Sequence, residues 1–246
     1  MLQTLFSALE FSQERLGYLT GNPSLLVMYA LELAAFISGL IYWRKFSGTP
    51  VIWFILFLGY NFLNEITAST IYIFGLAEHT SIFYNIRYPF YFGVYFYMYY
   101  KYSRSKRFKS AIAILFGVWL LSYLYFVLTN GVIERVAWFS RVLGGCFLFL
   151  VILFYLIETI NHNITGNFRD DFLVFVSLAL VLNLVVQLPV LTMTYVGWPK
   201  AMELDDTRRE FFNIIRNASF WVSCVMYLIF IYGFYRSKCP KLLMRE

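Results

Sequence analysis

The chain has 246 residues, of which 60% are apolar and 22% aromatic, and only 14% are charged. Soluble domains carry about a quarter charged residues, so this composition and its long apolar runs indicate an integral membrane protein. The net charge of +6 comes from cations beside apolar runs. It indicates topogenic charge and contact with the lipid bilayer, and it argues against nucleic acid as a partner.

The first 22 residues space leucine and phenylalanine at helical intervals, with glutamate and glutamine between them. This pattern predicts a short amphipathic helix over residues 1–22 at the membrane surface, with a frayed terminus as the alternative. Asn22-Pro23 ends it.

Seven apolar stretches follow, and each is long enough, at 1.5 Å per residue, to cross a hydrocarbon core of roughly 30 Å. They cover residues 25–43, 51–76, 82–101, 110–129, 136–158, 172–196 and 211–235. Turn-forming residues separate them, and no strand alternation appears. The sequence therefore predicts an all-α, polytopic membrane protein in which residues 1–246 form a single domain of seven transmembrane helices.

Lysine and arginine divide unevenly between the two ends of these stretches. Twelve lie on the flanks that include residues 44–45, 101–109 and 236–245, and five lie on the opposite flanks. Because the richer side is normally cytoplasmic, we expect the N-terminus outside and the C-terminus in the cytoplasm. The candidates for binding lipid headgroups or a protein partner are Lys101, Arg104, Lys106, Arg107 and Lys109.

Five ionisable side chains lie within the expected spans, where each costs roughly 2.5–3.5 kcal/mol on insertion scales. Amides accompany them at i, i+3 or i+4 spacing, which places them on helix faces turned towards other helices. With the expected orientation, these groups share one layer in the outer half of the bundle. The candidate ligand-binding residues are Glu32, Asn64, Glu65, Asn85, Arg87, Arg141, Asn183, Gln187, Asn213, Arg216 and Asn217.

Two interpretations of this layer compete. In one, Glu65 pairs with Arg87, and Glu32 pairs with Arg141 or Arg216, so that the charges only fix the register of the helices. In the other, the layer is an outward-opening pocket. Its three arginines outnumber its two carboxylates, and its aromatic walls suit a small anionic or amphipathic ligand. A permeation path is a third interpretation, which the apolar inner halves of the spans disfavour.

The sequence contains few of the groups that catalysis requires. It has no HExxH and no GxSxG motif, and no lysine within a span to hold retinal. Its two histidines, His79 and His162, fall in expected loops, and its three cysteines lack metal-ligand spacing. We therefore expect no metal and no cofactor and assign no catalytic residue, while an enzymatic activity stays open.

Two aromatic segments carry a resemblance. They are FYNIRYPFYFGVYFYMYYKY at Phe83–Tyr102, in which twelve of twenty residues are phenylalanine or tyrosine, and the segment Arg209–Tyr235. In both, the chain resembles a loose group of small seven-span inner-membrane proteins from Bacteroidota. The resemblance implies a seven-helix fold in a bacterial inner (cytoplasmic) membrane. It also implies a link with signalling, since some members of that group look like sensor modules.

The leading functional interpretation is a receptor-like or accessory integral membrane module. Such a module would bind a small anionic or amphipathic ligand, or a partner helix, in its outer polar layer. It would couple to a separate cytoplasmic or membrane partner, because no soluble output domain is expected. The alternatives are a structural subunit of a larger membrane protein complex and a small-anion transporter or channel.

Overall fold

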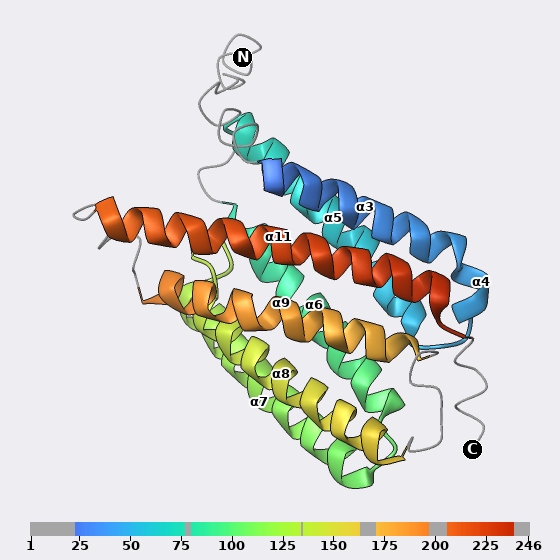
Figure 1. Ribbon diagram of the computed structural model, residues 1–246. Helices are drawn as coiled ribbons and strands as arrows, with labels where there is room; N and C mark the ends of the chain where they lie inside the picture. The colour runs from blue at the N-terminus through green and yellow to red at the C-terminus, as the bar shows by residue number, and fades with distance from the viewer. Residues whose placement is uncertain (1–22, 77–79, 134, 163–170, 197–205, 239–246) are drawn as a thin grey trace, which may run out of the picture.

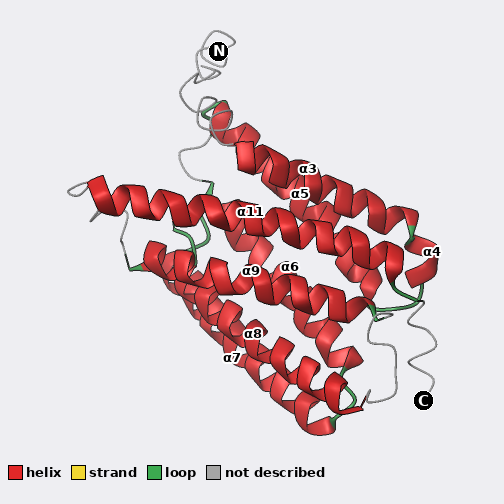
Figure 2. Cartoon of the chain, in the orientation of Figure 1, coloured by secondary structure: helices red, strands yellow, loops and turns green. Residues whose placement is uncertain are grey.

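The computed structural model describes residues 23–76, 80–133, 135–162, 171–196 and 206–238, and these form helices and connecting turns without a strand (Figures 1 and 2). The predicted surface helix over residues 1–22 lies outside them. The helices are α3 (Pro23–Ile41), α4 (Trp43–Phe46), α5 (Val51–Ile73), α6 (Ser81–Tyr102), α7 (Lys106–Asn130), α8 (Trp138–His162), α9 (Phe172–Tyr195) and α11 (Asp206–Arg236).

Six of these helices, α3, α5, α7, α8, α9 and α11, are long and apolar enough to cross a membrane. The all-α prediction is therefore confirmed for the described residues, and the helices are those of an integral membrane protein. Helix α6 has 22 residues but is not among the six. Eight of its residues are tyrosine, whose hydroxyl groups lower its hydropathy although its rings are large and apolar.

The long helices are arranged as a ring. Going round it, α3 contacts α5, α5 contacts α6, α6 contacts α8, α8 contacts α9, α9 contacts α11, and α11 returns to α3. Helix α7 lies against α6 and α8 on the outside of this ring (Figure 1). Because successive long helices run in opposite directions, α3, α6, α8 and α11 begin at the same end of the bundle at which α5, α7 and α9 finish.

Aromatic side chains fill the ring at the end opposite to those starts. Phe46, Phe54 and Phe230 are each fully buried, and so are Phe172 and Phe234. The ring centroids of Phe172 and Phe234 are 4.7 Å apart, and those of Phe54 and Phe230 are 5.1 Å apart. Offset and edge-on contacts at such distances are the favourable geometries for aromatic pairs, so this end of the bundle is closed.

A glycine allows α6 and α8 to approach closely. A Cβ atom on Gly144 would overlap the ring of Phe92, at less than any normal contact distance. The Phe92 ring is buried and packed against two other rings, with its centroid 4.7 Å from that of Trp119 and 5.0 Å from that of Tyr91. This contact sets the distance between two helices that also carry charged residues of the site.

Candidate functional site

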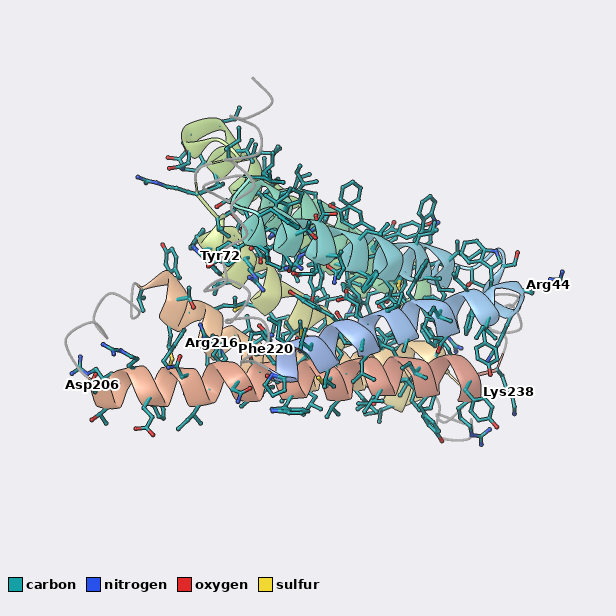
Figure 3. All side chains as sticks on the ribbon, turned by 90° about the horizontal axis from the view of Figure 1, so that it is seen from above. Arg44, Tyr72, Asp206, Arg216, Phe220 and Lys238 are labelled. Atoms are coloured by element: carbon teal, nitrogen blue, oxygen red, sulfur yellow. The ribbon has the colours of Figure 1, made fainter. Side chains whose placement is uncertain are left out.

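A cavity of about 740 Å³ lies inside the ring, at the end where α3, α6 and α8 begin. Side chains of α3, α5, α6, α8, α9 and α11 line it, whereas α7 contributes none. Figure 3 shows Arg216 and Phe220 on the face of α11 directed towards the interior, on the side of Tyr72. The charged and amide side chains of the lining are Glu32, Asn61, Glu65, Arg87, Arg141, Asn183, Gln187, Asn213 and Arg216.

Helical periodicity explains why each helix presents several lining residues. On α6 the lining residues Tyr84, Arg87, Tyr88, Tyr91 and Phe92 follow one another at intervals of three, one, three and one. Residues at such spacing share one face of an α-helix. The aromatic rings of α6 thus form a wall in which Arg87 is the charged member.

A hydrogen-bonded network connects α3, α5 and α6 at the cavity. Arg87 forms an ion pair with Glu65 through Nη1, and the same atom donates to Asn61 Oδ1 at 3.3 Å. Asn61 in turn donates through Nδ2 to Glu32 Oε1. Glu32 is fully buried, and its Oε2 has no hydrogen-bond partner among the described residues. Of the ion pairs expected from the sequence, the pair of Glu65 with Arg87 is present.

The pair between Glu32 and Arg141 or Arg216 is not found among the described residues. The Arg141 guanidinium lies instead 5.6 Å from the centroid of the Tyr88 ring and 5.6 Å from that of Trp138. Aromatic rings at this distance attract a cation through their quadrupoles without occupying its N–H donors. Arg141 therefore lines the cavity with no carboxylate of the described chain against it.

The remaining wall combines amides with the third arginine of the cavity. Asn183 donates to Ser223 Oγ at 2.9 Å and Gln187 donates to the same atom at 3.4 Å, which ties α9 to α11. Arg216 lies one helical turn from Phe212, with its guanidinium 5.9 Å from the ring centroid. Because both amides direct their N–H groups at Ser223, their carbonyl oxygens are the atoms left for other donors.

Eight of the eleven candidate ligand-binding residues line this cavity, and three do not. Asn64 donates to the Phe83 carbonyl at 3.2 Å, and Asn217 accepts from Ser24 Oγ at 2.6 Å. Asn85 donates to the carbonyls of Val132 and Arg135 at 2.8 and 2.7 Å and accepts from the Ala137 N–H at 2.9 Å. These three amides therefore link helices and loops instead of facing the cavity.

Several lining residues were not among the candidates. Asn61, Tyr84, Tyr88 and Trp138 all line the cavity. A spacing of three or four residues from Glu65, Arg87 and Arg141 would have indicated Asn61, Tyr84 and Trp138, and Tyr88 follows Tyr84 by four. Charge and amide content marked the candidates, so aromatic walls were expected around the layer without the individual residues being named.

A buried carboxylate at the other end of the bundle was also missed. Glu158 is 4% exposed and accepts hydrogen bonds from Ser103 Oγ and from the backbone N–H groups of Arg104 and Ser105. It thereby fixes the turn between α6 and α7. Of the predicted lipid-binding or partner-binding set, Lys101, Arg104, Lys106 and Arg107 are exposed and Lys109 is half-buried, all beside this turn and away from the cavity.

No known family model, curated protein or solved structure matches the chain. The described residues also contain no group of three or more histidine, cysteine, aspartate or glutamate side chains that would hold a metal ion. The fold and the site together define a helical integral membrane protein with a polar, aromatic-walled cavity inside its ring of helices. What this cavity offers to a ligand is guanidinium and amide hydrogen bonding and aromatic surface.

Proposed function

We propose that this protein is a receptor-like or accessory membrane module that binds a small anionic or amphipathic ligand in the cavity. The observation that carries the proposal is the set of groups around the Arg141 guanidinium. Its guanidinium lies 5.6 Å from the ring centroids of both Tyr88 and Trp138 and, within the described part of the chain, faces no carboxylate. A guanidinium of this kind presents a planar fork of donors, which matches a carboxylate or a phosphate.

The size and walls of the cavity support the same proposal. A volume of about 740 Å³ falls within the range of roughly 300–1,000 Å³ that is usual for small-molecule sites. Tyrosine, phenylalanine and leucine make up much of the lining. An apolar or aromatic body attached to an anionic group would therefore bury its body against these rings.

We further propose that α6 crosses the membrane with the other six long helices, in a bacterial inner membrane, with the N-terminus outside. A helix of 22 residues spans about 33 Å, which is enough for the hydrocarbon core. The exposed cations Lys101, Arg104, Lys106 and Arg107 lie at the end opposite to the cavity. If that end is cytoplasmic, the cavity belongs to the outer half.

Cysteine labelling in intact cells tests this topology, in a background without native cysteines. Leu76 and Arg104 are exposed and lie before and after α6. A membrane-impermeant maleimide should label Leu76→Cys in intact cells, and Arg104→Cys only after lysis. Labelling of both positions from the same side would mean that α6 does not cross.

Binding of simple anions to the purified protein in nanodiscs tests the function. Hexanoate and hexyl phosphate should bind in titration calorimetry, whereas hexanol should not. Arg141→Gln should weaken binding of the anions at least about tenfold, because a hydrogen bond to a charged group is lost. Arg135→Gln is the matched control, since Arg135 is exposed and does not line the cavity. Equal binding by both variants would refute the assignment.

Coupling to a separate partner would use the basic end of the bundle, where the turn fixed by Glu158 carries its exposed cations.

Transport is the less favoured alternative, because the buried rings of Phe54, Phe172 and Phe230 fill the path between the cavity and that end. Uptake of labelled hexanoate into proteoliposomes above the rate of protein-free vesicles would favour the transporter.

A further inference from the structure

The Ser223 hydroxyl on α11 determines how two amide side chains of α9 are oriented. Ser223 Oγ donates its proton to the Ser219 carbonyl at 2.9 Å, so only its lone pairs are left for other groups. Asn183 Nδ2 lies 2.9 Å from this oxygen, and Gln187 Nε2 lies 3.4 Å from it. A hydroxyl that can only accept requires the N–H end of each amide. Contact with α11 therefore directs both amide carbonyls away from Ser223.

The carbonyl oxygens of these two amides are acceptors that have no donor. Asn183 and Gln187 both line the cavity, and within the described chain neither Asn183 Oδ1 nor Gln187 Oε1 receives a hydrogen bond. Neither oxygen is among the buried side-chain atoms that lack a partner, so both have accessible surface. A ligand in the cavity would therefore meet two oxygens that accept a hydrogen bond and cannot donate one.

Arg141 lines the cavity close to the level of these amides, because α8 and α9 pack closely. A Cβ atom on Gly145 would lie 2.6 Å from a side-chain atom of Leu188 and 3.8 Å from one of Leu184. This turn of α8 therefore lies against those two leucines of α9. Arg141 precedes Gly145 by one helical turn, and Gln187 immediately precedes Leu188. The guanidinium and the amide carbonyls thus line one cavity from two neighbouring helices.

Resting on the proposed function, we infer that the ligand is a hydroxylated anion, whose anionic group binds Arg141 and whose hydroxyl donates to the carbonyl oxygen of Asn183 or Gln187. The guanidinium presents only donors and the amide carbonyls present only acceptors. A ligand that satisfies both therefore has an acceptor at one point and a donor at another. The donor is neutral, because the amides bring no charge to compensate an ammonium group within the spans. Hydroxy acids and the phosphoglycerol headgroup of phosphatidylglycerol both have this chemistry.

Matched probes that differ in one oxygen, or in its proton, separate this inference from simple anion binding. Hexanoate is compared with 2-, 3- and 6-hydroxyhexanoate, and with the methoxy acids that keep each oxygen without its proton. In nanodiscs of phosphatidylcholine, at least one hydroxy acid should bind about fivefold more tightly than hexanoate, since it adds one neutral hydrogen bond. The corresponding methoxy acid should lose this gain, and 2-aminohexanoate should bind no more tightly than hexanoate.

Replacing the two amides tests whether they accept the ligand's proton. In the double variant Asn183→Leu with Gln187→Met, hexanoate should still bind because Arg141 is unchanged, and the preference for the hydroxy acid should fall to about onefold. Asn64→Leu is the matched control, since Asn64 donates to the Phe83 carbonyl and does not line the cavity. It should keep the preference. Because the preference is a ratio of two affinities, a general loosening of the fold affects both probes alike.

Adding lipid to the nanodiscs distinguishes the two sources of a hydroxylated anion. If the headgroup of phosphatidylglycerol occupies the cavity, that lipid should weaken binding of the hydroxy acid. An equal amount of phosphatidic acid, which is anionic and has no headgroup hydroxyl, should not. If the ligand is a free hydroxy acid, neither lipid should change the affinity. Both results support a hydroxylated anion, provided that the amide double variant removes the preference.

Hexanoate binding that depends on Arg141, without a preference for any hydroxy acid, would overturn this inference and leave the proposed function standing. A methoxy acid that binds as tightly as its hydroxy acid would also overturn it, and that comparison needs only the wild-type protein. The same conclusion would follow if the amide double variant kept the preference, or if 2-aminohexanoate bound more tightly than every hydroxy acid. Failure of every probe to bind would overturn both the inference and the proposed function.

Discussion

Arg87 on α6 is ion-paired with Glu65 on α5, and the pair lies at the edge of the cavity with about a tenth of each side chain exposed. Arg141, on the next helix of the ring, lies beside two aromatic rings and has no such carboxylate among the residues that the structure describes. Two arginines that line the same cavity thus have different environments. We expect Arg87 to maintain the fold and Arg141 to contact the ligand.

Removing one member of the pair should destabilise the protein. Glu65→Gln leaves the Arg87 guanidinium unpaired away from water, and we expect the free energy of unfolding to fall by about 3 kcal/mol. SDS titration in mixed micelles measures this change. The double variant Glu65→Gln with Arg87→Gln should regain most of the loss, because no unpaired charge remains. Equal losses in the single and double variants would contradict a compensated pair.

Asn85 should affect stability and leave ligand binding intact. Asn85→Ala deprives the carbonyls of Val132 and Arg135 and the N–H of Ala137 of their partner. At about 1 kcal/mol for each hydrogen bond, the unfolding free energy should fall by about 2–3 kcal/mol. Hexanoate should bind the folded variant with the affinity of the wild type. Asn130→Ala, at an exposed position, serves as the control and should change neither quantity.

Glu158 should determine how well the turn between α6 and α7 resists proteolysis. Glu158→Ala leaves the N–H groups of Arg104 and Ser105 without their acceptor, and the expected cost is about 2 kcal/mol. Limited trypsin digestion in micelles should then cleave after Arg104 faster than in the wild type. Glu210→Ala removes a carboxylate from an exposed position and should leave the rate unchanged. A resistant Glu158→Ala variant would show that other contacts hold the turn.

Two glycines provide a matched test of the contact between α6 and α8. Gly144→Ala places a methyl group against the ring of Phe92, whereas a Cβ atom on Gly117 meets nothing within 4 Å. Overpacking a rigid contact costs about 1–3 kcal/mol, so Gly144→Ala should lower the unfolding midpoint. Gly117→Ala should raise the free energy of unfolding by about 0.5–1 kcal/mol, because alanine has the higher helix propensity. A midpoint for Gly144→Ala at or above that of the wild type would refute the close contact.

Much of the fold was predictable because it depends on local composition. Each expected apolar stretch overlaps one long helix, since a run of about twenty apolar residues has few other structures available. Helix α6 shows the limit of this reasoning. It was expected from its aromatic run, although it is not among the six helices that are apolar enough by hydropathy to count as candidate spans.

Part of the site was predictable for the same reason. Glu32, Glu65, Arg87 and Arg141 are costly in a membrane span, so their presence alone indicated an interior polar layer. Their partners were not predictable. In the sequence, Asn64, Asn85 and Asn183 are all amides within an apolar stretch. Only the positions of neighbouring backbone groups decide which of them face a cavity.

The sequence alone determined that this chain is helical, that its helices are apolar enough for a bilayer, and that a few charged residues must point inward. Those properties follow from side-chain hydropathy and the 3.6-residue period, which are local. The tertiary structure decided that Glu65 neutralises Arg87 while Tyr88 and Trp138 hold Arg141. That choice depends on which helices are neighbours in the ring, and packing between residues distant in the chain determines it.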